Sequence, residues 1–459
     1  MSAPVREDYR LVLRARTPVH VGADGANGIA DLPMATDGLG RLIIPGTSWA
    51  GVLRAVMRTI APAQENTVFG HADGEEGRAS RLSVFDTVVD DGGDLALRTG
   101  VGIDRRTGAA ADRLLYDRIV IPPGHRFTLD LRYDGPPSPA LAALVAHVRA
   151  TGLTIGAAGS RGLGRLDCQS ATVRRTDLHS RAAVLALLAG DTAAEDITPT
   201  PAAATGLGIR IAWRPREPVL VGAAAEGTTA HLVPLTTTGA DGGLVPVLPG
   251  SSIKGMLRSE AERAVRTLTG PDSDPGDDPA AAADALAARV PALAVLFGTR
   301  ERAGALRIPD VAATPEAGVP AAQWARQFTD TAPPNPPWAR PRTRVAIDRW
   351  TGGAADARLF TTLEPRIWSW EPISLDLDEA RIPDQQRTAA LVLLGVAAAP
   401  LVEGTARIGY ATTRGSGGIE PLEVTVTGIP GHTGDWWAWL RHLADGTPLD
   451  TLLGIGDLS

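Results

Sequence analysis

One long internal repeat constrains the fold more than any other feature of the sequence. Four motifs occur in the same order in each half of the 459-residue chain. The first-half motifs are TPVHVG at 17–22, IPGTSWAGVLR at 44–54, VGIDRRTGAAADRL at 101–114 and IGAAGSRGLGRL at 155–166. Their counterparts are EPVLVG at 217–222, LPGSSIKGMLR at 248–258, VAIDRWTGGAADARL at 345–359 and IGYATTRGSGGI at 408–419. A repeat of this length predicts two copies of one domain, not a solenoid of short repeats.

The length of the chain agrees with two domains of ordinary size. We expect a first domain at 1–190, a linker at 191–206, a second domain at 207–428 and a Trp-rich C-terminal extension at 429–459. Two low-complexity insertions near 270–290 and 311–342 account for the greater length of the second copy. Their Asp, Pro and Ala content is typical of loops.

The pattern of apolar residues predicts the local elements of each copy. Helical spacing from Trp49 to Ile60 predicts a helix that Thr47 or Ser48 would cap. A second helix is expected over 139–150 and a projecting hairpin over 100–120. The order strand, helix, strands, helix, strand is typical of an α+β, ferredoxin-like fold with insertions.

Composition excludes several classes of protein. The net charge of −7 differs from the basic balance of most nucleic-acid-binding domains, although an acidic body can carry a basic groove. Cys168 is the only cysteine, which excludes an internal disulfide and a cysteine-based zinc site. The uninterrupted apolar runs are too short for a membrane span, and the N-terminus lacks an apolar signal core. We therefore expect a cytoplasmic protein with no membrane partner.

The glycine-rich motifs and the helix starts are candidate sites for a phosphate. Glycine lets backbone N–H groups turn toward an anion, and a helix N-terminus offers free N–H groups and a positive dipole end. Tight surface turns and ordinary helix capping are the structural alternatives. The candidate residues are Ser48, Arg54, Gly159, Arg161, Gly162, Arg165, Ser252, Lys254, Arg258, Arg414 and Gly415.

The PG(S/T)S helix start, the IDRxTG hairpin and the terminal GxGRL loop together resemble the RAMP superfamily. The closest resemblance is to the backbone subunits of type III CRISPR effector complexes, and the tandem arrangement is similar to the subtype D branch. The resemblance implies two modified RNA-recognition folds, each with a thumb hairpin and a glycine-rich loop, that stack along a CRISPR RNA. It also implies that each thumb displaces a base of the guide–target duplex. An aspartate in the loop before the first helix would cut target RNA there with a divalent metal, which we expect to be Mg²⁺.

The resemblance assigns roles residue by residue. Asp31, two residues before Pro33, matches the catalytic and metal-binding aspartate of the family. Aligning Pro33 with Pro234 puts Leu232 opposite Asp31, with His231 beside it, so we expect the second copy not to cut. The phosphate candidates above would contact the guide backbone. The hairpin residues expected to stack on bases are Arg105, Arg106, Arg349 and Trp350.

We therefore expect a CRISPR RNA-binding backbone subunit whose first copy cleaves target RNA. Its expected partners are the CRISPR RNA, the target RNA, a polymerase-like large subunit and further RAMP subunits. Three alternatives stay open at this point. These are a structural guide-binding subunit with no cutting activity, a RAMP-fold endoribonuclease that matures precursor CRISPR RNA, and a protein scaffold. The loops lack the histidine pair that a metal-independent ribonuclease uses.

Overall fold

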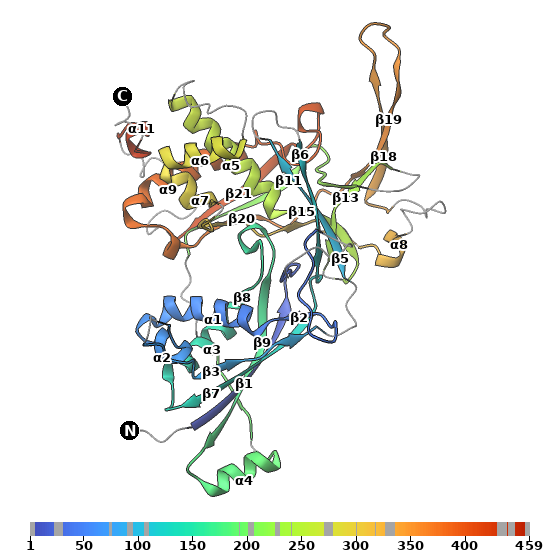
Figure 1. Ribbon diagram of the computed structural model, residues 1–459. Coiled ribbons are helices and arrows are strands. Elements are labelled where there is room, and N and C mark those ends of the chain that lie inside the picture. The colour runs from blue at the N-terminus through green and yellow to red at the C-terminus, as the bar shows by residue number, and fades with distance from the viewer. Residues whose placement is uncertain are drawn as a thin grey trace. The chain divides into compact units, whose positions relative to one another are not determined.

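The chain divides into two compact units in the computed structural model (Figure 1). Unit 1 comprises residues 1–98, 116–159 and 163–204, and unit 2 comprises 99–115, 160–162 and 205–459. The structure describes residues 5–22, 31–72, 76–89, 95–104, 110–191, 193–200, 206–224, 230–239, 241–269, 279–299, 301–316, 318–325, 336–428, 438 and 446–454.

Unit 1 is built on an antiparallel sheet with β1 (Val5–Ala15) at its centre. β1 pairs with β7 (Arg126–Gly135) on one side and with β9 (Arg165–Asp177) on the other. β3 (Leu82–Val84) follows β7, and β10 (Glu195–Asp196) and β8 (Leu153–Thr154) pair with β9. Alternate residues of β1 are buried, as expected for a sheet with one face against a core.

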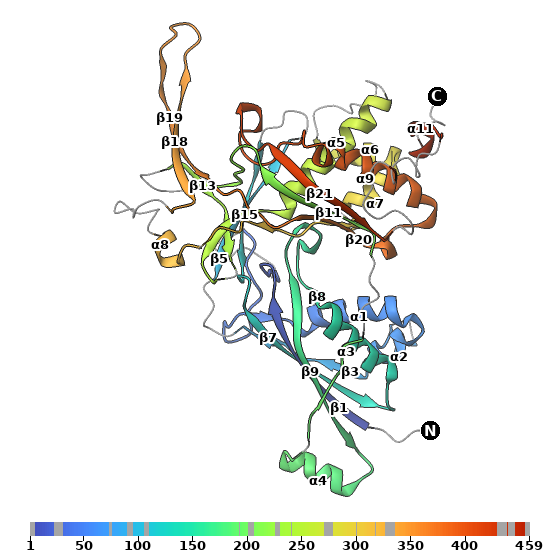
Figure 2. The ribbon, with the colours of Figure 1, turned by 180° about the vertical axis from the view of Figure 1, so that it is seen from behind.

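Two helices cover one face of this sheet. α1 (Gly46–Ile60) and α3 (Pro139–Thr151) enclose an apolar core with the buried side of β1 (Figure 2). Trp49 and Leu53 of α1 are fully buried, at positions that the apolar spacing predicted. The smaller elements are β2 (Ile43–Ile44), β4 (Thr87–Val88), η1 (Pro62–Gln64), α2 (Glu65–Phe69) and α4 (Arg181–Ala189). The short helical turn η2 (Gly159–Arg161) begins in unit 1, and its last two residues are grouped with unit 2. β5 (Ala96–Ile103) and β6 (Ala110–Val120) pair as a two-stranded sheet.

Unit 2 repeats the same sheet. β11 (Gly208–Pro215) lies between β20 (Ile373–Leu377) and β21 (Ile419–Thr427), and β16 (Leu306–Arg307) follows β20. The order β16-β20-β11-β21 corresponds to β3-β7-β1-β9 of unit 1. Both central strands carry a bulge at the matching place, after Val12 and after Ala212. The duplication predicted from the motifs is therefore a duplication of structure.

The helices of unit 2 also follow the first copy. α5 (Gly250–Thr269) and α9 (Arg387–Val402) pack against each other and line the core. With the preceding turn, α9 is long and apolar enough to meet the criteria for a membrane span. More than half of that stretch is buried within the unit, as expected for a core helix. The other helices are α6 (Pro279–Arg289), α7 (Pro291–Phe297), α8 (Ala321–Ala325), η5 (Glu379–Arg381), η6 (Asp384–Gln386), η7 (Thr412–Arg414) and α11 (Leu449–Leu452).

A second sheet of unit 2 carries its longest hairpin. β18 (Ala339–Ile347) and β19 (Ala354–Pro365) pair with each other and extend away from the rest of the unit (Figure 1, Figure 2). β13 (Leu232–Pro234) joins β19, and β12 (Gly222–Ala224) joins β13. A further small sheet contains β14 (Thr236–Thr238), β15 (Leu244–Leu248) and β17 (Val311–Ala312).

Four sequence predictions need comment here. The stretches near 270–290 and 311–342, expected to be loops, contain α6 in the first and β17, α8 and the start of β18 in the second. The helix cap is not Thr47 or Ser48, because α1 begins at Gly46 after Pro45 and has no side-chain cap from its own segment. The carboxylate of Asp86 takes the place of a cap and accepts a hydrogen bond from Gly46 N at 2.7 Å. The stretch predicted as a linker contains β10, which adds to the unit 1 sheet. Most of the Trp-rich extension lies outside the described residues.

Replacing Asp86 tests this cap. Asp86→Ala should destabilise unit 1 by about 1 kcal/mol, because Gly46 N loses its acceptor and the helix N-terminus loses a negative charge. Asp86→Asn keeps a carbonyl acceptor and should lose less. Urea unfolding of the three chains gives the comparison, and an unchanged midpoint for Asp86→Ala would show that water satisfies Gly46 N equally well.

Candidate functional site

Repeated motifs that lie far apart in the sequence meet at one place in each copy. In unit 1 the TPVHVG segment after β1 lies against the glycine-rich loop. Gly164 N donates to Pro18 O at 2.8 Å, and Ala157 N donates to His20 O at 3.0 Å. The same segment pairs with the root of β6 through an isolated bridge between Val19 and Ile121. One short segment therefore fixes both the glycine loop and the hairpin root.

The second copy repeats the loop contacts. Gly417 N donates to Pro218 O at 3.0 Å, and Tyr410 N donates to Leu220 O at 2.6 Å. The closing position favours glycine because Gly164 has φ +79° and Gly417 has φ +82°. A Cβ at Gly417 would also lie 2.3 Å from the carbonyl oxygen of Ile408. The recurring glycines therefore serve the backbone path of the loop.

An alanine in a left-handed conformation occurs at the same place in both loops. Ala158 has φ +59° and Ala411 has φ +58°. This region costs an L-residue roughly 1–2 kcal/mol. Each loop then turns through a short 3-10 segment, η2 or η7, whose last residue is Arg161 or Arg414. The loop conformation is thus the same in both copies although most of its side chains differ.

The arginines at the ends of these turns are exposed. Neither Arg161 nor Arg414 forms an ion pair with a carboxylate among the described residues. The guanidinium of Arg414 lies 5.2 Å from the centre of the Tyr410 ring, a cation–π distance. Arg165, at the end of the first loop, instead donates to the Thr151 carbonyl at 3.3 Å. Gly415 faces open space.

At the start of each helix, most of the free backbone N–H groups already donate hydrogen bonds within the protein. Gly250 N donates to the carboxylate of Asp310 at 2.9 Å, as Gly46 N does to Asp86. The next hydrogen bonds run from Ser48 N to Pro45 O and from Ser252 N to Pro249 O, both at 2.9 Å. The positive end of each helix is therefore already occupied by an aspartate. Ser48 and Ser252 are both half-buried.

The recurring arginine of the helix motif supports the fold in both copies. Arg54 donates to the Gly70 carbonyl at 3.2 Å and to Glu65 at 2.6 Å. Arg258 donates to the Gly298 carbonyl at 3.4 Å and to Glu262 at 2.8 Å. In each copy the arginine links its helix to the glycine that ends a later helix, α2 for Gly70 and α7 for Gly298.

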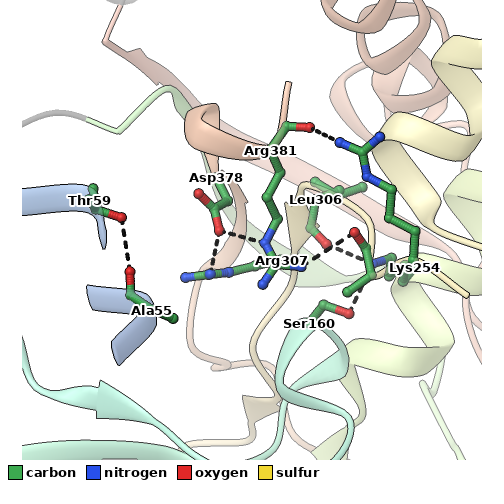
Figure 3. Close-up of polar contacts among 10 residues, drawn as sticks. Ala55, Thr59, Ser160, Lys254, Leu306, Arg307, Asp378 and Arg381 are labelled. Carbon is green, nitrogen blue, oxygen red and sulfur yellow. Dashed lines mark hydrogen bonds and ion pairs between the residues drawn. The ribbon is translucent and has the colours of Figure 1, made fainter. Parts of the chain in front are cut away.

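Lys254 is buried, with 6% of its surface exposed. Its amine donates to the Leu306 carbonyl at 2.7 Å and to Ser160 Oγ at 3.2 Å, both grouped with unit 2 (Figure 3). Burial, with a smaller effect of nearby arginines, lowers the pKa of Lys254 to about 7. The side chain of Lys254 therefore lies inside the unit, with its amine bonded to protein atoms.

The IDRxTG motif of the second copy forms the tip of the β18–β19 hairpin. Asp348 Oδ1 accepts hydrogen bonds from Trp350 N and Thr351 N, each at 2.9 Å. These bonds lower the pKa of Asp348, and the carboxylate caps the turn of the hairpin. Trp350 is 98% exposed, and Arg349 beside it is also exposed. Arg105 and Arg106 of the first copy lie outside the described residues.

Asp31 lies at the root of the first hairpin. Its Oδ2 accepts a hydrogen bond from Asp117 N of β6 at 3.0 Å. Leu32 N donates to Asp117 O at 3.1 Å, and Leu32 pairs with Arg118 in a parallel bridge. Asp31 is exposed, and its Oδ2 is fixed by the hairpin backbone.

The backbone pairing corrects the sequence alignment of the second copy. Gly22 pairs with Met34, and Gly222 pairs with Pro234 in the same antiparallel manner. Pro234 therefore matches Met34 and not Pro33. The two prolines occupy neighbouring positions, and a shift of one residue reverses the face on which each side chain lies.

With this register, His231 occupies the place of Asp31 and Leu232 the place of Leu32. The bridge of Leu232 is parallel, to Thr362 of β19, as that of Leu32 is to Arg118. Thr361 N donates to His231 Nδ1 at 3.1 Å, so His231 makes the same side-chain contact with the hairpin as Asp31. The expectation that Leu232 replaces the aspartate was wrong by one residue. His231 has no carboxylate, so the residue that matches Asp31 in the second copy still lacks one, as expected.

Asp117 is a candidate residue that the sequence did not indicate. Its Oδ1 is buried and has no hydrogen-bond partner among the described residues. Its backbone N–H binds Asp31, so two aspartates lie together at this root. In the second copy the matching residue is Thr361. Mg²⁺ is commonly held by one or two carboxylates plus phosphate oxygens and water, so the Asp31–Asp117 pair suits such an ion. The described residues contain no cluster of three acidic, His or Cys ligands.

The fold and the duplicated site define a two-domain α/β protein, and the comparison with family models identifies it further. The RAMP superfamily model matches residues 12–167 and 228–420. These regions cover more than half of the chain, which therefore belongs to the RAMP superfamily. The first matched region contains all four motifs of its copy, and the second contains the last three of its copy. No curated protein matches the chain. Membership of the superfamily supports a CRISPR-associated role in RNA binding.

Substitutions at two glycines of the second loop measure the cost of backbone strain separately from the cost of a steric clash. Both Gly415 and Gly417 have a φ near +80°, but only Gly417 has a backbone atom within contact distance of a new Cβ. Gly415→Ala should cost about 1 kcal/mol from strain alone, and Gly417→Ala about 3 kcal/mol. Urea unfolding of unit 2 measures both. Equal losses would mean that the approach to Ile408 O relaxes without cost.

The buried lysine predicts a pH dependence of stability. Its folded pKa is near 7 and its ordinary value is 10.5, so the unfolded chain binds more protons between these pH values. The stability of unit 2 should therefore rise by about 2 kcal/mol from pH 7 to pH 9 through this group. Lys254→Met should remove that rise. Denaturant midpoints of both proteins across this range measure it, and parallel curves would show that Lys254 titrates at its ordinary pKa.

Proposed function

We propose that this chain is a CRISPR RNA-binding backbone subunit of a type III effector complex, and that its first copy cleaves guide-paired target RNA. One observation carries the proposal. In each copy the glycine loop contacts the segment after the first strand, and residue 31 or 231 binds the hairpin root, but among the described residues aspartates lie at that root only in the first copy.

The sheet order supports an RNA-recognition type of domain. The arrangement β9-β1-β7-β3 with two helices on one face suits the ferredoxin-like fold expected from the sequence, and unit 2 repeats it. Exposed arginines at equivalent turns, Arg161 and Arg414, are suited to guide phosphates. Arg54, Arg258 and Lys254 are bonded within the protein, so we assign the main guide contacts to the two glycine loops.

The hairpins supply the thumbs of this model. In the second copy the turn held by Asp348 presents Trp350 with nearly all of its surface exposed. An exposed indole stacks on an unpaired base with a gain of about 1–3 kcal/mol, which offsets the cost of unstacking that base. We assign this stacking role to Trp350 and, in the first copy, to the matching hairpin tip.

Cleavage is assigned to the root of the first hairpin. Asp31 and Asp117 would hold a divalent metal, expected to be Mg²⁺, which neutralises charge on the scissile phosphate and its leaving oxygen when bound. Asp117 N fixes the orientation of the exposed Asp31 carboxylate through Oδ2. A base displaced by the thumb frees the RNA backbone to align its 2′-OH with the leaving oxygen, which an A-form duplex prevents.

The subunit role accounts for the two copies better than a solitary enzyme does. A chain with two similar backbone surfaces and one carboxylate pair suits a repeating assembly on one guide, with further RAMP subunits and a polymerase-like subunit as partners. We place this assembly in the cytoplasm. The second assignment to be tested is a guide-binding subunit that does not cut.

Asp31→Ala should abolish one cut in the target RNA. Guide and target binding should remain nearly unchanged, because the substitution removes one exposed carboxylate. Asp117→Asn should slow the same cut, and Asp130→Ala, a sheet carboxylate paired with Arg10, serves as the matched control. The assay is end-labelled target RNA, resolved by length, with assembled complexes in Mg²⁺.

The band pattern decides between the assignments. If the Asp31→Ala complex keeps every band, the first copy does not cut through Asp31, and the structural guide-binding subunit is favoured. If two bands both depend on this chain, the second copy is active without a carboxylate. Cleavage of precursor CRISPR RNA by the isolated chain would favour the maturation enzyme instead.

A further inference from the structure

His231 takes the place of Asp31 in the second copy, but the chemistry that its hydrogen bond allows is different. The imidazole is exposed at the root of the β18–β19 hairpin. Thr361 N donates to its Nδ1 at 3.1 Å, while His231 N donates to Thr361 O at 2.8 Å. The ring is thus held by a two-point contact between its own residue and one residue of β19.

This contact fixes the protonation pattern of the ring. A backbone N–H can only donate, so the ring atom that faces it must be an acceptor. Nδ1 therefore carries no proton, and the proton of the neutral imidazole is on Nε2. His20 of the first copy shows the opposite arrangement, because its Nδ1 lies 2.7 Å from the Ile119 carbonyl, which can only accept.

The free end of the His231 ring is consequently a hydrogen-bond donor. Nε2–H can bind an anionic oxygen but cannot accept a proton. The lone pair that could accept one is on Nδ1 and is engaged by Thr361 N. The Asp31 carboxylate has the opposite property, because its oxygens are negatively charged hydrogen-bond acceptors. The same backbone position therefore presents a cation ligand in one copy and an anion ligand in the other.

We propose that His231 binds a non-bridging phosphate oxygen of the target RNA strand through Nε2–H, and so holds the strand at the second copy without cutting it. The inference rests on the proposed function for the position of the RNA, but the ring orientation follows from this chain alone. Thr361, which replaces Asp117, brings no negative charge that would repel a phosphate.

The first test concerns the ring itself. Long-range ¹⁵N–¹H spectra of the chain labelled at histidine, assigned by comparison with His231→Ala, should show the Nε2–H form for His231. A protonated Nδ1 in the free chain would overturn the proposal, because the ring would then not be oriented by Thr361. This result does not depend on whether the chain binds a guide.

The second test concerns the phosphate. A series of target RNAs, each with one neutral methylphosphonate, is bound to the assembled wild-type complex. One substitution, away from the cut made by the first copy, should weaken binding about tenfold. In the His231→Ala complex the same substitution should have no effect. His231→Gln, which keeps an amide donor near Nε2, should restore part of the effect, and His179→Ala, an exposed histidine of unit 1, should behave as wild type.

The outcomes separate this inference from the proposed function. A loss of affinity only at the phosphate cut through Asp31 leaves the proposed function intact and overturns the role of His231. A series with no sensitive phosphate at all overturns both. If His231→Ala removes a cleavage band, His231 is a catalytic residue, and its assignment as a donor that only holds the strand is wrong.

Discussion

Both copies depend on one close approach of backbone to backbone. The segment after the first strand accepts hydrogen bonds from the glycine loop at Pro18 O and Pro218 O, and only a residue without a Cβ fits the donor position. This contact closes the loop against the same segment that pairs with the hairpin root in the first copy. The loop and the root are therefore positioned by one element, which explains why the motifs recur together and not singly.

The duplication and the glycine loops could be predicted from the sequence, because a positive φ or a close backbone approach restricts the residue type at a fixed spacing. Family membership followed from the same motifs and is confirmed. The helix caps could not be predicted, since Asp86 lies 40 residues from Gly46 and Asp310 lies 60 residues from Gly250. A carboxylate that reaches a helix from that distance leaves no local pattern.

The candidate site was predicted in part. Asp31 came from a resemblance, whereas Asp117 lies on a hairpin strand where no motif marks it. The choice of Leu232 in place of His231 arose from aligning two prolines that occupy neighbouring positions in the folded chain. The register of these short strands is set by pairing with residues that are distant in the sequence. Sequence similarity alone therefore could not distinguish two alignments that differ by one position.

Recurrence of a charged residue proved to be ambiguous evidence for ligand binding. Arg54 and Arg258 occur at the same motif position and make equivalent bonds to Gly70 O and Gly298 O. Packing alone explains their repetition. Arg161 and Arg414 recur just as clearly but are exposed, and burial and bonding are what separate the two pairs.

The pairing of Asp31 with His231 has a consequence at the level of codons. Aspartate and histidine codons differ by one base at the first position, so a single substitution can exchange them in either direction. Threonine and aspartate codons differ by at least two bases, so the second copy needs several changes to gain both carboxylates of the first. Loss of the Asp31 carboxylate is thus one mutational step away, and gain of a complete second carboxylate pair is not.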